Sequence, residues 1–299
     1  MSVAMPPPDQ AVLARRERIV AALRAIVPGE GVIAAEREMR PYEADGLTAY
    51  RQLPMVVVLP GTTEQVSRVL AFCHAEGIKV VPRGAGTSLS GGALPLADGV
   101  LLGMAKFNRI REIDFANRVA VVEPGVTNLA VTQAVEHAGF YYAPDHSSQI
   151  ACTIGGNVAE NSGGVHCLKY GMTTNNLLGC ELVLMTGEVV RVGGKHLDAG
   201  GYDLLGIITG SEGLLGVVTE ITVRILRRPD GARAVLVGFA SSEDAGECVS
   251  KVIGAGIRSR FSTPTPCSPV STPPTSTQSR RMSAPNFSVR SSSPGLLAS

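Results

Sequence analysis

Three glycine-rich segments limit what this chain can fold into more than any other feature. They read PRGAGTSLSGG (82–92), CTIGGNVAENSGG (152–164) and GSEGLLG (210–216). Glycine permits backbone conformations and close approaches that a Cβ atom would forbid. Successive main-chain N–H groups in such turns form concavities that bind anions. Each segment alone could be structural, but three of them in one chain predict a single large, extended ligand.

The first segment has the chemistry to hold a pyrophosphate. It follows a predicted strand–helix–strand unit, the hydroxyl groups of Thr87, Ser88 and Ser90 are donors, and Arg83 adds a positive charge. It is not a Walker loop, because no Gly-Lys-Ser or Gly-Lys-Thr follows, and Leu89 occupies the third glycine position of the Rossmann fingerprint. Taken alone, this segment could equally be a surface turn between strands.

The second segment adds side chains that can recognise a heterocycle. Asn157 and Asn161 each offer amide donors and an amide acceptor, which suit the polar edge of a ring. The third segment places its glycines before a β-branched strand, whose main-chain groups could pair with a similar edge.

The apolar pattern predicts an α+β domain rather than a doubly wound sheet, because short strands and helices follow one another in irregular order. Capping-box spacing from Thr62 to Gln65 and a stop at Gly77 bound one helix. Strands are expected at 55–59, 79–81, 100–102, 119–123, 182–185, 189–192 and up to 225, and further helices at 9–27, 127–138, 202–208 and from 242.

The order of four motifs makes the expectation specific. PRGAGTSLSGG, VVEPGV, YYAPDHSSQIACTIGGNVAENSGGVHCLKYG and TGSEGLLGVVTE together closely resemble the p-cresol-methylhydroxylase-type FAD-binding domain, most of all in the group of glycolate oxidase D subunits and D-lactate dehydrogenases. The resemblance covers about 53–229 and implies an FAD between two α+β subdomains. It implies a helical lead-in at 1–50, the FAD-binding domain at 51–229, and the start of an incomplete substrate (cap) domain at 230–257.

The resemblance also implies which residues hold the cofactor. The pyrophosphate would lie against Pro82, Arg83, Gly84, Ala85, Gly86, Thr87 and Ser88. The ribityl chain and flavin would contact Pro144, Asp145, Ser147, Ser148, Thr153, Gly155, Gly156, Asn157, Ala159 and Asn161. The remaining cofactor surface would meet Glu212, Gly213, Gly216, Val217 and Val218. The first segment has no histidine where relatives attach flavin covalently, so noncovalent FAD is expected.

One residue departs from the pattern in a way that bears on catalysis. His146 stands where relatives usually carry Pro, and a histidine near a flavin could accept a proton, since its ordinary pKa is about 6.5. A tolerated loop substitution is the more common reason for such a change. The other histidines are expected to be structural or solvated, and no metal site is expected; they are His74, His137, His166 and His196.

The family implies oxidation of a 2-hydroxy acid such as glycolate or D-lactate, with hydride transfer to FAD and onward transfer to partner subunits or quinone. Iron–sulfur subunits and second flavin-domain subunits are the expected partners. The catalytic residues would belong to a substrate domain that nothing after Ile257 resembles, so activity of this chain is expected to be impaired. A non-catalytic FAD-binding module or assembly subunit is the alternative, and a different oxidation on the same scaffold is a third.

Composition excludes several other classes. The net charge of +1 gives no argument for binding nucleic acid. No stretch approaches the roughly 20 apolar residues of a transmembrane helix, and the N-terminus has no secretory pattern. Six cysteines without metal or disulfide spacing fit a reducing cytoplasm. We expect a cytoplasmic protein, or one attached to the inner face of the membrane through partner subunits.

The last part of the chain differs from the rest. Residues 258–299 contain no Asp, Glu or Lys and are rich in Ser, Thr, Pro and Arg. Such a segment cannot bury a core and is expected to be disordered. It is either a natural basic tail or an out-of-frame extension, and we favour the second.

Overall fold

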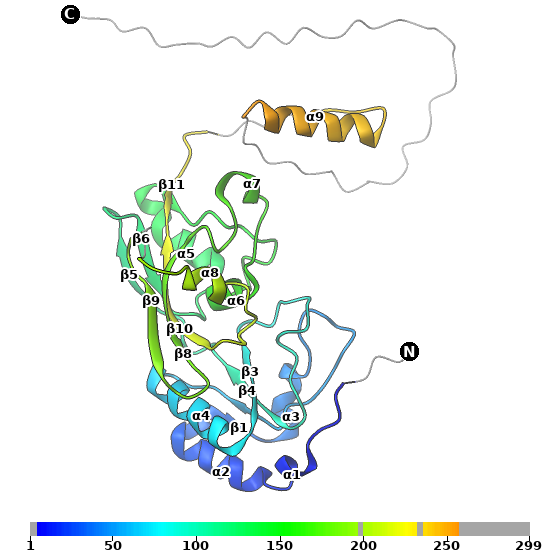
Figure 1. Ribbon diagram of the computed structural model, residues 1–299, viewed down its shortest axis with the longest axis vertical. Coiled ribbons are helices and arrows are strands. Elements are labelled where there is room, and N and C mark those ends of the chain that lie inside the picture. The colour runs from blue at the N-terminus through cyan, green and yellow to red at the C-terminus, as the bar shows by residue number, and fades with distance from the viewer. Residues whose placement is uncertain (1–4, 197–199, 232–235, 257–299) are drawn as a thin grey trace, which may run out of the picture. The chain divides into compact units, whose positions relative to one another are not determined.

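Two main β-sheets with helices packed against them make up the fold (Figure 1). The computed structural model describes residues 5–196, 200–231 and 236–256, which all belong to one unit of the chain. The expectation for 258–299 lies outside the described residues. The predicted α+β class is confirmed, because both sheets are short-stranded and mixed with helices in irregular order.

The first sheet has the order β1-β2-β4-β3, in which β2, β4 and β3 are parallel and β1 is antiparallel. Its strands are β1 (Val32–Ile33), β2 (Val56–Val58), β3 (Lys79–Arg83) and β4 (Gly99–Gly103). One face packs on α2 (Arg16–Ile26) and α4 (Thr63–Glu76), and the other on α3 (Glu36–Met39). Alternate strand residues point to opposite faces, so Val56 and Val58 meet α2 and α4, whereas Val57 meets Met39.

Local signals explain where α4 begins and ends. Thr62 accepts a hydrogen bond from the N–H of Gln65 at 3.2 Å, which satisfies one of the helix's free amides. Gly77 ends the helix with φ +66°, a left-handed conformation that glycine adopts without strain. The predicted bounds of this helix are confirmed.

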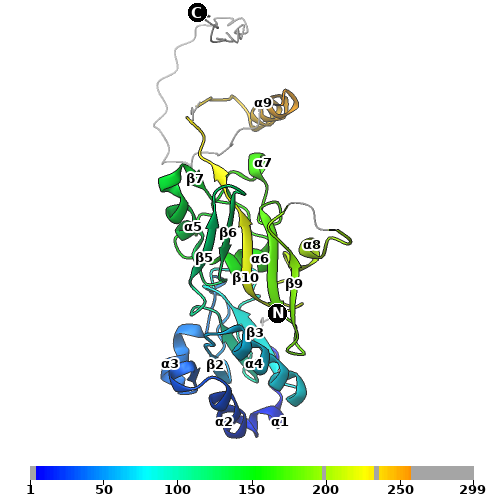
Figure 2. The ribbon, with the colours of Figure 1, turned by 90° about the vertical axis from the view of Figure 1, so that its left-hand side faces the viewer.

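The second sheet has the order β5-β6-β10-β8-β9 and is antiparallel throughout (Figure 2). Its strands are β5 (Ile110–Asp114), β6 (Val119–Val122), β8 (Leu177–Val183), β9 (Val189–Gly193) and β10 (Val217–Arg224). An apolar face packs on α5 (Asn128–Val135), α6 (Ile154–Glu160) and α8 (Leu204–Ile208). A small pair, β7 (Phe140–Tyr141) and β11 (Leu226–Arg227), lies outside this sheet.

Some predicted elements differ from the observed ones. The helix expected at 9–27 is broken into α1 (Gln10–Leu13) and α2, and the helix expected at 127–138 ends in a 3-10 turn, η3 (Glu136–Ala138). Two further 3-10 turns, η1 (Gly29–Gly31) and η2 (Arg40–Tyr42), and the short helix α7 (Cys167–Tyr170) carry no strong periodic signal. Helix α9 (Ser242–Gly254) forms where a helix was expected. The domain boundaries at 50, 229 and 257 stay predictions.

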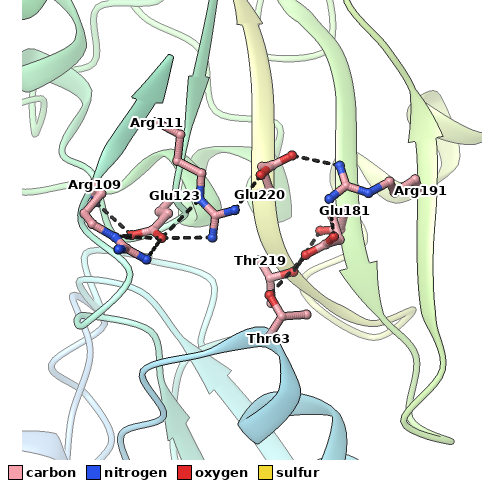
Figure 3. Close-up of polar contacts among 8 residues, drawn as sticks. All are labelled: Thr63, Arg109, Arg111, Glu123, Glu181, Arg191, Thr219 and Glu220. Carbon is pink, nitrogen blue, oxygen red and sulfur yellow. Dashed lines mark hydrogen bonds and ion pairs between the residues drawn. The ribbon is translucent and has the colours of Figure 1, made fainter.

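A line of acidic and basic side chains crosses the second sheet on the face away from its helices (Figure 3). Arg111 donates to Glu123 at 3.0 Å and to Glu220 at 2.8 Å. Arg191 donates to Glu220 at 2.8 Å and to Glu181 at 2.5 Å. Four strands, β5, β10, β8 and β9, and the residue after β6 are therefore cross-linked by charge-assisted hydrogen bonds.

Two of the register shifts in this sheet lie along the line of charged side chains. The register shifts between Ile110 and Glu112 on β5, and between Val218 and Glu220 on β10. A bulge inserts an extra residue and changes the direction of nearby side chains. Arg111 and Thr219 are the residues inside the two shifts, and both join the polar line.

At Glu181 the line of charged side chains reaches α4, the helix that packs on the first sheet. Glu181 accepts from the hydroxyl of Thr219 at 2.8 Å and from the hydroxyl of Thr63, the first residue of α4, at 3.1 Å (Figure 3). One turn further along α4, Ser67 donates to the carbonyl of Gly187 in the β8–β9 turn at 2.5 Å. Helix α4 therefore fastens the first sheet to the second.

Glu123 anchors the other end of the line. Its side chain is 1% exposed and accepts from the backbone and guanidinium of Arg109 and from Arg111. Burial opposes ionisation of this carboxyl, but the hydrogen bonds from the two arginines outweigh it and lower its pKa.

We predict that Glu123→Ala lowers the free energy of unfolding by about 1–3 kcal/mol, because it removes a buried carboxylate that accepts from the backbone and guanidinium of Arg109 and from Arg111. Urea titration measures this. Glu112→Ala is the matched control: Glu112 pairs with Lys195 at the surface, so its loss should cost about 0–1 kcal/mol. Since the folded-state pKa of Glu123 lies below its ordinary 4.5, the wild-type advantage should persist above pH 4.5 and shrink as the pH falls further. Equal losses in the two variants would contradict the prediction.

Candidate functional site

The three glycine-rich segments meet at positions where only glycine fits. A Cβ atom on Gly84 would lie 2.5 Å from the hydroxyl oxygen of Thr153 and 3.7 Å from the backbone nitrogen of Gly156. A Cβ atom on Gly213, which has φ +76°, would lie 2.5 Å from Cγ of Pro82. The first segment therefore touches the second at Gly84 and the third at Pro82.

Helix α6 joins the second segment to the third through its last turn. The N–H of Gly210 donates to the carbonyl of Val158 at 2.8 Å, and the N–H of Glu212 donates to the carbonyl of Ala159 at 2.8 Å. Carbonyls in the last turn of a helix lack partners within it; the third segment supplies one for Ala159 and a second one for Val158, whose carbonyl also accepts from the N–H of Asn161 at 3.3 Å. Glu212 holds a left-handed backbone conformation, with φ +52°, to make this connection.

A cavity opens where the three segments converge, and its walls include residues of β3 in the first sheet and of β10 in the second. Eleven predicted cofactor residues line it: Pro82, Arg83, Gly84, Gly155, Gly156, Ala159, Glu212, Gly213, Gly216, Val217 and Val218. The sequence analysis missed its other lining residues: Met104, Pro124, Val158, Ile208 and Ser211. Pro124 belongs to the VVEPGV motif, Val158 to the second glycine-rich segment and Ser211 to the third, and these motifs were the available signal; Met104 and Ile208 are apolar residues with no local signature.

The first segment lines the cavity at Pro82, Arg83 and Gly84 and continues beyond it, with a backbone that suits the anionic part of a long cofactor. Among the described residues, the N–H groups of 84–89 make no hydrogen bond within the protein. A run of free main-chain donors after a strand is the concavity that a phosphate group requires. The hydroxyl of Thr153 is also buried without a partner among the described residues, directly beneath Gly84. The residues present therefore fit FAD.

Arg83 makes contacts that the sequence analysis did not predict. Its guanidinium is buried and donates to the carbonyls of Ala44 at 2.8 Å, Ala93 at 3.2 Å and Tyr42 at 3.4 Å. Burial lowers its pKa, which the nearby Asp45 partly offsets. The side chain holds the surrounding backbone in place, and a direct contact with a pyrophosphate stays a prediction.

The rest of the first segment lies beside two carboxylates. Ser88 and Ser90 share a hydrogen bond of 2.9 Å between hydroxyls, and Ser90 donates to Glu160 at 3.0 Å. A Cβ atom on Gly92 would lie 2.9 Å from a carboxylate oxygen of Glu212. The cofactor roles of Ala85, Gly86, Thr87 and Ser88 stay predictions, because these residues do not line the cavity.

The segment 144–148 contacts the second glycine-rich segment at Gly164, and buried side-chain amides hold it through hydrogen bonds. Asn157 donates to Asn128 at 3.0 Å, and Asn128 donates to the carbonyl of Pro144 at 2.8 Å. Asn161, with φ +48°, accepts from the N–H of Thr174 at 3.1 Å. These amides bind the protein itself, so their predicted contacts with a flavin are not visible in the structure. The predicted flavin contacts of Pro144, Asp145, Ser147 and Ser148 likewise stay predictions.

Asp145 has a partner that the sequence analysis missed. Its carboxylate lies 2.7 Å from Nδ1 of His166 and accepts from the N–H of the same residue at 3.3 Å. The expectation that His166 is structural or solvated stays a prediction, and the structure adds its contact with Asp145. The two residues are far apart in sequence and no local pattern connects them.

His146 is buried, and neither ring nitrogen has a partner among the described residues. Burial lowers its pKa, although Asp145 acts in the opposite direction. Burial therefore disfavours the charged form of this imidazole. Its role as a proton acceptor stays a prediction.

Among the described residues, no three His, Cys, Asp or Glu side chains are grouped so that they could hold a metal ion. No helix in the described part of the chain has both the length and the apolar character needed to cross a membrane.

We predict that Gly84→Ala destabilises the protein by about 1–3 kcal/mol, because the new methyl group overpacks against Thr153. The measurement is the urea midpoint. Adding Thr153→Ala should recover most of the loss by removing the clashing hydroxyl. Gly61→Ala, whose methyl group would lie 3.8 Å from Gln65, is the control and should be nearly neutral. A Gly84→Ala protein as stable as the control would contradict the close approach.

We predict that His146 makes stability fall in acid. Because its folded-state pKa is below the ordinary 6.5, the unfolded chain binds the proton more readily, and stability should decline as the pH falls below 6.5. The comparison is the unfolding free energy of wild type and His146→Leu at several pH values. The variant should gain on the wild type steadily below pH 6.5, and a constant difference would refute this role.

Comparisons with known proteins agree with this geometry. Residues 54–193 match the family described as an FAD binding domain. Glycolate oxidase subunit GlcD of Escherichia coli (strain K12) is 55% identical over 242 residues, which are 81% of this chain and 48% of that protein. D-lactate dehydrogenase of Archaeoglobus fulgidus is 40% identical over 198 residues, 66% of this chain and 44% of that protein. The chain spans about half the length of the curated relatives it matches.

Solved structures share the fold at low sequence identity. An alkyldihydroxyacetonephosphate synthase superposes with a TM-score of 0.68 at 20% identity, over 85% of this chain and 47% of that one. A p-cresol methylhydroxylase superposes with a TM-score of 0.66 at 22% identity, over 82% of this chain and 49% of that one. Residues 54–193 therefore form an FAD binding domain that is homologous to glycolate oxidase subunit GlcD and D-lactate dehydrogenase and shares its fold with p-cresol methylhydroxylase.

Proposed function

We propose that this protein takes part in the FAD-dependent oxidation of a 2-hydroxy acid, such as glycolate or D-lactate, to the 2-oxo acid. The observation that carries the proposal is the convergence of all three glycine-rich segments on one cavity. The names of the relatives, a glycolate oxidase subunit and a D-lactate dehydrogenase, supply the substrate class.

Each segment has a distinct task in this proposal. The free N–H groups of 84–89 hold the pyrophosphate, and the glycines of α6 allow the cofactor to approach the backbone. Val217 and Val218 give the cavity an apolar wall at the start of β10 and exclude water there. Bound FAD would supply the acceptor for a hydride from the substrate carbon.

The cofactor is proposed to be noncovalent. The first segment contains no histidine, and the residues of this chain that line the cavity offer backbone groups, apolar side chains, Arg83 and Glu212. Iron–sulfur and second flavin-domain subunits are the proposed partners. A cytoplasmic location, free or at the inner face of the membrane through those subunits, completes the proposal.

A second candidate function is a non-catalytic FAD-binding module or assembly subunit. The charges in the cavity favour it: Arg83 is already bound to backbone carbonyls, and Glu212 would repel a carboxylate substrate. Orientation of a 2-hydroxy acid would then need groups from outside the described residues.

The test uses the purified chain and its flavin absorbance. We predict yellow protein that releases its FAD into the supernatant on acid precipitation, because no covalent bond holds it. Anaerobic glycolate or D-lactate should bleach the bound flavin if the chain is an oxidase, and should leave it yellow if the chain is a module. Gly84→Ala should bind FAD more weakly and serves as the matched comparison. Folded protein that remains colourless with added FAD would overturn the proposal.

A further inference from the structure

Asn128 is a buried polar side chain that links separate parts of the chain near the site. It is 1% exposed and is the first residue of α5. Its amide nitrogen donates to the carbonyl of Pro144 at 2.8 Å, and its amide oxygen accepts from the amide of Asn157 at 3.0 Å. Its own backbone N–H donates to the carbonyl of Cys152 at 3.0 Å. One residue thus joins three separate stretches of chain.

The start of α5 strengthens the same connection. The first N–H groups of a helix have no acceptor within it. Here the N–H of Leu129 donates to the carbonyl of Gln149 at 3.0 Å, next to the bond from Asn128 to Cys152, and Thr127 forms a β-bridge with Thr153. The stretch 149–153 is therefore held against the N-terminus of α5. It leads directly into α6, whose residues line the cavity.

We propose that Asn128 is a positioning residue that sets the place of segment 144–148 relative to α6, and thereby the environment of the flavin. The inference rests on the proposed function, because Pro144, Asp145, Ser147 and Ser148 are cofactor residues only in that proposal. It assigns Asn128 a role that the cofactor motifs do not include, and it gives Asn157 a task apart from direct contact with the flavin.

The chemistry of the relay explains why an asparagine is required. The position needs a donor toward the Pro144 carbonyl and an acceptor toward the Asn157 amide at the same time, and an amide provides both. Aspartate keeps the acceptor but loses the donor and places a buried carboxylate against a carbonyl oxygen. Leucine has a similar size and removes both bonds, which leaves two buried partners unsatisfied.

The variants Asn128→Asp and Asn128→Leu separate the two bonds, and Asn128→Ser is a third variant should either fail to fold. Asp98→Ala is the matched control. Asp98 is also buried and joins distant segments, through the N–H of Asp9 and the side chain of Lys79, both at 2.8 Å, but it lies at the opposite end of β3 from the first segment.

We expect the Asn128 variants to bind FAD roughly tenfold more weakly or worse, which corresponds to ~1.4 kcal/mol, and to shift the visible absorbance and midpoint potential of bound flavin. Asp98→Ala should lose stability without moving the spectrum or the potential. In protein without FAD, hydrogen exchange of the amides at 144–153 should be faster in the Asn128 variants than in the control.

Two different failures can be told apart. Wild-type protein that does not bind FAD would refute the proposed function, while the exchange measurement would still test whether Asn128 holds 144–153 in place. Wild-type affinity, spectrum and exchange in folded Asn128→Asp and Asn128→Leu would overturn the inference itself.

Discussion

The rest of the structure depends on the close approach of the three glycine-rich segments at α6, the helix that belongs to the second of them. The start of α6 lies next to Gly84, where no side chain fits, and the carbonyls of its last turn accept the N–H groups of Gly210 and Glu212. A helix this short could not be stable alone, so it forms because the neighbouring segments satisfy both of its ends. The cavity walls then follow from the positions of those segments.

The two sheets must be fixed to each other for these contacts to hold. On the side away from the helices of the second sheet, Thr63 of α4 reaches Glu181, and Ser67 reaches the β8–β9 turn. The charged line behind Glu181 ties this fastening to four strands of the second sheet and to Glu123 (Figure 3). The polar face thus keeps the subdomains in register, while the apolar face and the loops form the site.

Elements with complete local signals were predicted well. Helix α4 has an N-cap, a periodic apolar face and a terminal glycine, and its bounds agree with the structure. Short elements such as α6, α7 and β7 were missed, because their stability comes from tertiary hydrogen bonds rather than from propensity. In the site, glycines were identified correctly as places of close approach, since that property belongs to the residue itself.

The sequence by itself determined the class of the fold, through its pattern of short strands and helices, and the kind of cofactor, through the resemblance of its ordered glycine motifs to a known family. Only the tertiary structure decided what each polar side chain does. Arg83 donates to backbone carbonyls, Asn157 is linked to Pro144 through Asn128, and His166 pairs with Asp145. These partners come from residues far away in the chain, and a hydrogen bond depends on distance and direction in space, which no spacing in sequence records.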